Sequence, residues 1–339
     1  MNNTHRLRRS IAALSVLSLL GLAAACGSDE PDSTLAEGGW DSIVEAAKKE
    51  GSVTVYSSQG QTQLDDFAAA FEKEYGIEVE VVRGIDPELQ PKIEAEKQTG
   101  KTVADVYVSS LRPAQETFAD QDYYVAPQGP AFEELDVMQG DEIFDIDATV
   151  LTFAWNTDLF PGKVESYADL LDPAFKGKLG VPEPTSATFV DYYNYLTGIH
   201  GEDFLEKLAA QDPQIYPGAL PAAEALSSGE IAGAIFVEPQ VDQQEAGAPV
   251  DFGFEDEKWA AVFYGGIIAD APHPNAAQLL ADFMLTEAGQ EAIARKAASV
   301  RPDVPGTFGT LDSVRRIDYE ALTPEAVTDF QNKWNKLFR

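Results

Sequence analysis

The sequence predicts an α/β fold made of two units, each a mostly parallel sheet flanked by helices. Segments rich in β-branched residues alternate with segments that have apolar residues at helical spacing, which is typical of parallel sheets covered on both faces. The chain has 339 residues, enough for two domains of about 150 residues each. With 44% hydrophobic and 24% charged residues, its composition is that of a globular protein rather than a disordered one.

The first unit starts with a helix that has Asp41 at its N-cap and ends at Gly51. The β-branched run SVTVY then predicts a strand, and apolar residues from Leu64 to Tyr75 recur at helical spacing. The predicted order is helix, strand, helix, strand, helix, strand, over residues 41–50, 52–56, 64–75, 77–82, 89–98 and 104–108.

Polar residues follow two of these strands. Ser57, Ser58 and Gln59 come directly after SVTVY, and Ser109 and Ser110 come after ADVYV. Ligands of open parallel sheets bind at the carboxyl ends of the strands, so these side chains are candidates for a binding site.

A second unit follows an apolar segment at residues 148–157. Its predicted elements are a helix near 166–171, a strand at 178–182, helices from 188, 203 and 220, a strand at 233–237, an extended segment at 258–271, and helices at 274–297 and about 324–338. No internal repeat is apparent.

Charge and cysteine usage exclude several classes of function. With 24 Lys and Arg against 57 Asp and Glu, the formal net charge is −33, so nucleic acid is not expected as a partner. A single cysteine excludes an internal disulfide and any cysteine-rich metal site, and three histidines argue against a histidine-rich one.

The first 25 residues have the pattern of a signal peptide. Arg6, Arg8 and Arg9 precede an uncharged apolar run at residues 11–25, which is too short for a membrane span. The run ends in LAAAC, which resembles a bacterial lipobox and implies cleavage before Cys26 and a diacylglyceryl group on its sulfur. Residues 26–38 then form a polar tether. The alternative is a conventional signal peptide with an incidental cysteine, and the sequence leaves Sec and Tat export open.

The order of segments resembles the solute-binding proteins of bacterial ABC importers, in the ferric-ion-binding branch of the type II periplasmic-binding-protein fold. The matching pieces are SVTVYSSQ, FEKEYGIEVEVVRG, ADVYVSS, TFAWNTDLF, SYADLLDPAFKGKLGVPEPTSATF, SSGEIAGAIFVEP and HPNAAQLLADFMLTEAGQEAIA. The resemblance implies two lobes that trap a ligand between them, and delivery of that ligand to a membrane permease and its ATPase.

The resemblance also implies a division of the chain. Lobe 1 would comprise residues 39–150, lobe 2 residues 151–262, and residues 263–339 would return to lobe 1 and brace the hinge. The crossings between the lobes are expected near residues 149–155 and 263–269.

Carrying over the family's ligand positions selects the loops at Ser57, Ser58 and Gln59 and at Ser109 and Ser110. In the second lobe, PTSAT resembles the family's anion-cradling turn, which adds Thr185, Ser186, Ala187 and Thr188. Thr185 or Ser186 would cap a helix over residues 188–197, whose free N–H groups and dipole attract an anion. The alternative is a plain N-cap.

The family's iron ligands are missing. Where the family has a histidine, an acid and paired tyrosines, this chain has Gly60, Ser110 and Pro239-Gln240. Tyr192, Tyr193 and Tyr195 cluster inside a predicted helix and are expected to pack there. We therefore expect a small organic or oxyanionic solute rather than ferric iron, with no metal and no cofactor.

Two further residues complete the candidate site. Glu238 follows the strand GAIFV and is placed to pair with an ammonium group of the solute, unless it is a solvated loop acid. Tyr264, followed by Gly265 and Gly266, is placed either against the ligand or in the core. Asp145 and Asp147 are acidic candidates of the same kind as Glu238.

Rival classes find little support. The sequence has no Ser-x-x-Lys, Gly-x-Ser-x-Gly, Walker or His-Glu-x-x-His motif, so no enzyme activity is predicted. A lipid-anchored hydrolase or adhesin is the alternative. The solute is left open among a phosphonate, a phosphate ester, a polyamine, a thiamine-like cation, a carboxylate and an iron chelate. The expected protein is a monomer, tethered to the outer face of the cell membrane.

Overall fold

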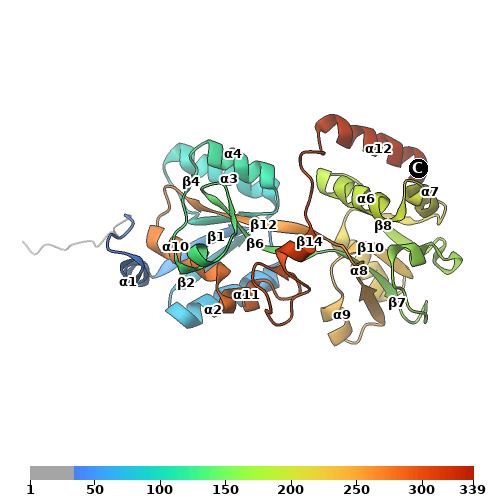
Figure 1. The fold of residues 1–339 in the computed structure, drawn as a ribbon, viewed down its shortest axis with the longest axis horizontal. Coiled ribbons are helices and arrows are strands. Elements are labelled where there is room, and N and C mark those ends of the chain that lie inside the picture. The colour runs from blue at the N-terminus through green and yellow to red at the C-terminus, as the bar shows by residue number, and fades with distance from the viewer. Residues whose placement is uncertain (1–33) are drawn as a thin grey trace, which may run out of the picture. The chain divides into compact units, whose positions relative to one another are not determined.

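The computed structural model describes residues 34–339, so the predicted leader and Cys26 lie outside the described residues, as does most of the tether. Two sheets organise the described chain (Figure 1). We call each sheet with its helices a lobe. None of the helices within residues 34–339 has the length and apolar character that a membrane span requires.

The first lobe contains a nine-stranded sheet with the central order β13-β6-β12-β3-β1-β2. Its strands are β1 (Ser52–Ser57), β2 (Glu78–Arg83), β3 (Val106–Ser109), β4 (Tyr124–Val125), β5 (Met138–Gln139), β6 (Ile143–Val150), β12 (Lys258–Ile268), β13 (Ala298–Ser299) and β14 (Val314–Arg315). Strand β1 runs parallel to β2 and β3, as the alternating pattern predicts. The sheet is nevertheless mixed, because β12 returns antiparallel between β3 and β6.

Helices cover both faces of this sheet. The helices are α1 (Trp40–Glu50), α2 (Gln61–Tyr75), α3 (Asp86–Thr99), α4 (Arg112–Asp120), α5 (Pro130–Glu134), α10 (Pro274–Leu285) and α11 (Glu287–Ile293). Phe67 and Phe71 of α2 pack with Phe283 of α10 on one face. Leu89 of α3 and Phe118 of α4 pack on the other. The predicted helix over 274–297 is thus two helices, because Thr286 ends the first and caps the second.

The second lobe contains a five-stranded sheet with the order β11-β7-β10-β8-β9. Its elements are β7 (Thr152–Asn156), β8 (Leu179–Pro182), α6 (Ala187–His200), α7 (Phe204–Ala209), β9 (Gln214–Tyr216), α8 (Ala219–Ser228), β10 (Gly233–Val237), α9 (Val241–Glu245), β11 (Val250–Gly253) and α12 (Pro324–Phe338). Short 3₁₀ turns lie at Tyr167–Leu171 and Pro173–Phe175, and a third precedes β14 at Leu311–Ser313.

The chain crosses between the lobes three times. The first crossing is at Leu151, between β6 and β7, inside the predicted segment. The second is at residues 254–257, upstream of the expected 263–269, because β12 already belongs to the first sheet. Within β12, Gly265 and Gly266 leave room for two aromatic rings of the core. A Cβ atom at Gly265 would lie 2.4 Å from the ring of Phe144, and one at Gly266 would lie 2.6 Å from the ring of Tyr124.

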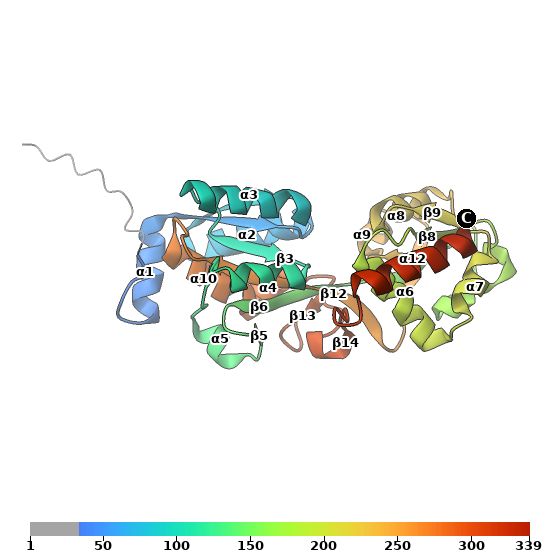
Figure 2. The ribbon, with the colours of Figure 1, turned by 90° about the horizontal axis from the view of Figure 1, so that it is seen from above.

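The third crossing, at residues 316–323, carries the chain to α12. This helix was expected on lobe 1, but it packs against α6 and α7 of the second lobe, as both ribbon views show (Figures 1 and 2). The cause is its apolar face: buried Trp334 contacts Tyr193 of α6. Arg315 pairs with Asp191 of α6 at 2.8 Å.

Candidate functional site

A cavity of about 550 Å³ lies between the lobes on the α2 and α11 side. The first lobe contributes Ser58 after β1, residues 60–63 at the start of α2 with Asp66 further along that helix, Arg83 at the end of β2, and residues 295–297 after α11. The second lobe contributes Glu238 after β10, with Asp242 and Glu245 on α9. Cavities of this size are typical of small-molecule sites.

The floor of the cavity is organised by a buried acid on β6. Asp147 accepts hydrogen bonds from Gln59 Nε2 at 2.8 Å and from Gln63 Nε2 at 2.6 Å. Burial raises the pKa of Asp147 to about 8, and the two amide hydrogen bonds act in the opposite direction. Gln63 also donates to the carbonyl of Ile293, so both amide hydrogens are used and its Oε1 atom is left to accept a hydrogen bond from a solute.

Strand β10 ends in a bulge that presents Glu238 to the cavity. The pairing register between β10 and β7 shifts between Ala234 and Val237. Within the bulge Phe236 has a φ of 57°, a left-handed conformation that is costly for an aromatic residue. Its N–H donates to the hydroxyl of Tyr192 at 3.1 Å, which helps to hold this conformation. Strain of this kind is often found at functional sites.

The wall that the second lobe contributes to the cavity is acidic and would attract a cation. Glu238 is exposed to solvent at the cavity wall, although nearby protein atoms partly desolvate its carboxylate. This partial desolvation raises the pKa of Glu238, and the nearby charge of Asp242 raises it further. Both effects are relieved if a cation binds beside Glu238.

The first lobe supplies the positive charges. Arg83 is anchored by a bond of 3.4 Å from its Nε atom to the carbonyl of Gln59. Lys296, held at a φ of 66°, pairs with Asp242 across the cavity. Arg295 lines the same wall. Sequence reasoning missed these three residues and Gln63, although Arg83 ends β2 at the same sheet edge as the predicted serines and could have been found there.

Of the residues selected from the first lobe, Ser58 lines the cavity, and Ser57 and Gln59 lie buried beneath it. The Oγ atom of Ser58 is buried and has no hydrogen-bond partner among the described residues. Ser57 Oγ accepts a bond of 3.1 Å from the N–H of Gln59 and so shapes the loop. Ser109 Oγ accepts from the N–H of Leu111 at 3.0 Å in the same way.

The remaining predicted residues lie outside the walls of this cavity. The carbonyl of Ser110 accepts a bond of 2.8 Å from the hydroxyl of Tyr319. Helix α6 begins at Ala187, with Ser186 at the N-cap position but without a side-chain capping bond. Thr185 and Ser186 are exposed there, and Ala187 and Thr188 are half-buried.

Tyr264 lies in the core of the first lobe, and its neighbour Phe263 lines the cavity. Burial raises the pKa of Tyr264 to about 12, and the charge of Asp145 adds to the effect. Asp145 is paired with Arg316 at 2.6 Å, and neither residue is in the cavity wall. The two acids of β6 therefore have different partners: Asp147 is bonded to glutamines beneath the cavity, and Asp145 is paired with Arg316 away from it.

The tyrosines of α6 are packed as expected. Tyr193 donates to the carbonyl of Pro182 at 2.7 Å, and Tyr195 donates to the carbonyl of Glu257 at 2.6 Å. With Tyr192 they are buried in the core of the second lobe. Within residues 34–339 no group of three or more His, Cys, Asp or Glu residues is placed to hold a metal ion.

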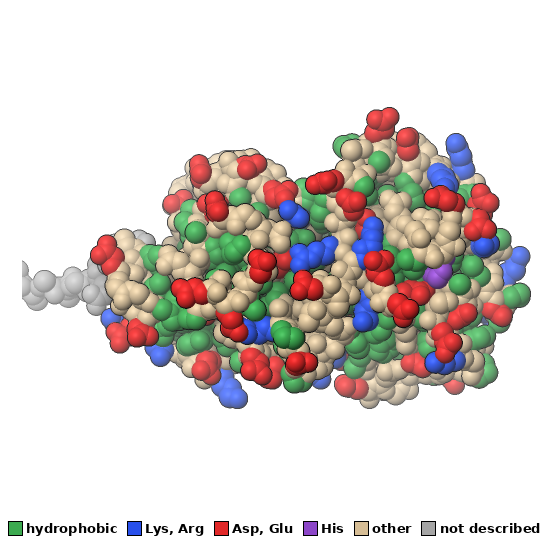
Figure 3. All heavy atoms as spheres, viewed as in Figure 1, with side chains coloured by type: hydrophobic (Ala, Val, Ile, Leu, Met, Phe, Trp, Pro, Cys, Tyr) green, Lys and Arg blue, Asp and Glu red, His purple; other side chains and the backbone are tan. Residues whose placement is uncertain are grey.

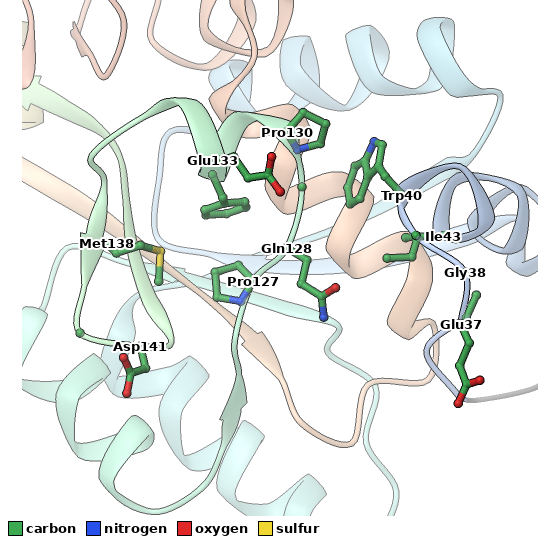
Figure 4. A pocket seen from close by; sticks show the side chains of 15 residues that line it. Glu37, Gly38, Trp40, Ile43, Pro127, Gln128, Pro130, Glu133, Met138 and Asp141 are labelled. Atoms are coloured by element: carbon green, nitrogen blue, oxygen red, sulfur yellow. The ribbon is translucent and has the colours of Figure 1, made fainter.

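A larger hollow of about 900 Å³ lies within the first lobe alone (Figure 4). Trp40 and Ile43 of α1 face Pro127 and Pro130 across it. It takes no residue from the second lobe and none of the predicted site residues. The cavity between the lobes is therefore the stronger candidate site.

One arrangement at the opposite edge of the first sheet has the geometry of a nucleophile, a base and an acid. Ser52 Oγ lies 3.4 Å from Nε2 of His273, whose Nδ1 lies 2.9 Å from buried Asp105. Asp105 also accepts from the N–H groups of Thr54 at 2.7 Å and of His273 at 2.8 Å. These bonds join the start of β1 to the start of α10.

Comparison with known proteins identifies the family. Residues 53–296 match the family described as bacterial extracellular solute-binding protein. An uncharacterized protein of Haemophilus influenzae is 23% identical over 278 residues, which cover 76% of this chain and 79% of the relative. Among solved structures, the substrate binding protein of an ABC transporter from Agrobacterium tumefaciens has a TM-score of 0.69 at 16% identity, covering 85% of this chain and 95% of that one.

Two other solved structures are similar in fold. Iron-bound HitA from Pseudomonas aeruginosa has a TM-score of 0.63 at 20% identity, covering 84% of this chain and 99% of that one. AfuA from Actinobacillus pleuropneumoniae, with exogenous fructose-6-phosphate bound, has a TM-score of 0.63 at 21% identity, covering 85% and 98%. The chain therefore belongs to the bacterial extracellular solute-binding proteins, and its fold is that of type II periplasmic binding proteins.

Proposed function

We propose that the cavity between the lobes holds a small organic or oxyanionic solute for import. The observation that carries this proposal is the meeting of Ser58, Gln63 and Arg83 from one lobe with Glu238 from the other around one space. Polar groups that converge on a cavity fix the orientation of a small ligand. Closing the lobes on such a solute would bury it from water.

Ferric iron is disfavoured as the cargo by the chemistry of the residues present. Iron(III) is a hard cation that needs several anionic oxygen ligands, and the positions expected to carry them hold Gly60, Ser110, Pro239 and Gln240. The hydroxyls of Tyr193 and Tyr195 are used in packing the second lobe. The similar structures differ in cargo, since HitA is iron-bound and AfuA holds fructose-6-phosphate.

Native mass spectrometry of the mature protein tests this proposal. We expect a retained molecule of small mass, lost on denaturation and retained less by the Gln63→Ala variant. Exposed Gln121→Ala, which lies outside the cavity wall, is the matched control. A visible charge-transfer band after addition of one equivalent of ferric salt would instead show iron to be the cargo.

We also propose that Cys26 carries a lipid that tethers a monomeric protein to the outer face of the membrane. The support is the LAAAC pattern and the polar stretch after it. A diacylglyceryl group supplies two chains, and each buried methylene contributes about 0.8 kcal/mol. Cys26→Ser should remove palmitate labelling and release the protein. Persistence of both the label and the membrane fraction in that variant would exclude lipidation at Cys26.

We further propose that the protein has no enzymatic activity and that Ser52, His273 and Asp105 have a structural role. None of these three residues lines either of the two cavities described above, and the oxygens of Asp105 accept hydrogen bonds from backbone N–H groups as well as contacting His273 Nδ1. Hydrolysis of p-nitrophenyl acetate should be the same for the protein and for Ser52→Ala. A rate that falls in the variant would support the hydrolase alternative.

A further inference from the structure

The walls of the cavity between the lobes carry opposite charges. Arg83, Arg295 and Lys296 come from the first lobe, together with one acid, Asp66, while Glu238, Asp242 and Glu245 come from the second. Acidic side chains are scattered over the face seen in Figure 3. A cavity with a positive and a negative wall selects for a solute that carries both charges.

Most of these charges are not used by the protein itself. Lys296 is paired with Asp242. Across residues 34–339, the Arg83 side chain makes only the contact from its Nε to the carbonyl of Gln59, and the side chains of Arg295, Glu238 and Glu245 have no hydrogen bond or ion pair. Among the residues that line the cavity, two cations and three acids, Asp66 included, have no ion pair, so charges of both signs are available to a ligand.

The neutral groups of the cavity suit the middle of such a solute. Phe263 supplies an apolar surface, and Ser58 Oγ is buried in the wall without a partner among the described residues. Gln63 has an accepting Oε1 atom, because Asp147 and the Ile293 carbonyl hold both of its amide hydrogens. Oriented acceptors and a negative wall recognise an amine, and the guanidinium of Arg83 recognises a carboxylate or phosphate-like group.

From these observations we infer that the solute is zwitterionic: a small molecule with an amine that binds beside Glu238 and an acid group that binds beside Arg83. This inference rests on the proposed function, because it names the substrate class of the same cavity. Such a zwitterion differs from the simple anion or simple cation that a cavity with walls of one charge would select.

Matched probes with the same carbon chain test the inference. δ-Aminovalerate carries an amine and a carboxylate, cadaverine carries two amines, and glutarate carries two carboxylates. Binding of each to the mature protein is measured by calorimetry, together with γ-aminobutyrate and β-alanine as shorter amino acids. At least one amino acid should bind about ten- to a hundredfold more tightly than both cadaverine and glutarate, since each loses one charge-assisted contact.

Variants assign the two ends. Glu238→Gln should weaken the amino acids and cadaverine by about tenfold or more and leave glutarate unchanged. Arg83→Gln should weaken the amino acids and glutarate and spare cadaverine. Glu202→Gln and Lys101→Gln are matched controls, because both residues are exposed and lie outside the cavity.

Several results would overturn the inference. These are equal or tighter binding of cadaverine or glutarate, failure of all three amino acids to bind at millimolar concentration, or variants that change the ligand-free shape without changing affinity. The last result would mean that the charges serve only the attraction between lobes. If native mass spectrometry still shows a retained solute in these cases, the proposed function stands and only the zwitterion is wrong.

Discussion

Lys296 pairs with Asp242, although the lysine follows α11 of the first lobe and the aspartate lies on α9 of the second. The side chain of Lys296 is 24% exposed and that of Asp242 is 70% exposed. An ion pair this open to water contributes less than about 1 kcal/mol to stability, but it can still bias the distance between two lobes joined by three crossings.

Lys296→Met should therefore open the ligand-free protein without unfolding it. We expect a larger radius of gyration in small-angle X-ray scattering and a melting temperature within a few degrees of the unmodified protein. Lys207→Met is the control, because it removes an exposed pair with Asp203, four residues earlier in the same lobe. An unchanged radius in Lys296→Met would mean that the pair does not hold the lobes together.

Asp147 should make stability fall with rising pH. Its pKa is raised from 3.8 to about 8 by burial, so the native state binds its proton more tightly than the unfolded state does. The stabilisation is complete below pH 4 and is lost as the pH rises towards 8. Asp147→Asn removes this titration, so its stability relative to the unmodified protein should rise from pH 5 to pH 8.5, measured by urea unfolding.

The exposed acid Asp120, changed to Asn, serves as the control for that experiment. It separates the effect of Asp147 from the general repulsion in a chain of net charge −33. A stability difference for Asp147→Asn that is constant over this pH range would mean that Asp147 titrates normally in the native state.

The pair of His273 and Asp105 should stabilise the protein at low pH. A hydrogen bond to Asp105 is the largest of the causes that raise the pKa of His273 above 6.5. Its stabilising effect is complete below pH 6.5 and is lost as the pH rises through the native pKa. His273→Gln should cost about 1–2 kcal/mol at pH 6 and less at pH 9, because hydrogen bonds to a charged group are the strong ones.

An NMR titration of the His273 imidazole checks the same point without a variant. A midpoint below 6.5 would show that desolvation, which lowers the pKa, outweighs the contact with Asp105.

Ser186→Ala should leave the ligand-free protein as stable as before. Ser186 occupies the N-cap position of α6, but its side chain makes no capping bond there. Thr323→Ala is the contrasting variant: Thr323 Oγ1 accepts from the N–H of Ala326 at 3.2 Å and caps α12. Loss of that cap should cost about 1 kcal/mol. A similar loss for Ser186→Ala in thermal melts would show that it caps α6 after all.

Local signals in the sequence were enough for most strands and helices. Strands β1, β3 and β10 are rich in β-branched and other apolar residues, and glycines end α1 and α2. These signals lie within or next to each element, so they can be recognised without knowing the tertiary fold. The position of the second crossing was not predictable in this way. The apolar segment at residues 258–271 could pair with either sheet, and only its contacts with β3 and β6 decide between them.

Only some of the residues that line the candidate cavity could be selected from the sequence, for the same reason. Ser58 and Glu238 follow strands, and the rule for carboxyl ends finds them. Gln63 and Lys296 lie in and after helices whose packing brings them to the cavity, so no local pattern indicates them. Asp147 had a weak signal, an acid within the otherwise apolar run IFDIDATV, but its partners at Gln59 and Gln63 depend on the tertiary fold.

Because α12 packs on the second lobe, a label at the C-terminal end of the chain would move with that lobe. Trp334 packs this helix against α6. Near the other end of the described chain, the N–H of Ala36 donates a hydrogen bond of 2.8 Å to Oδ1 of Asn275 in the first lobe. Fluorophores attached near residues 36 and 339 would thus be carried by different lobes. Energy transfer between them would report opening and closing in real time, and a solute could be detected optically without knowing its identity beforehand.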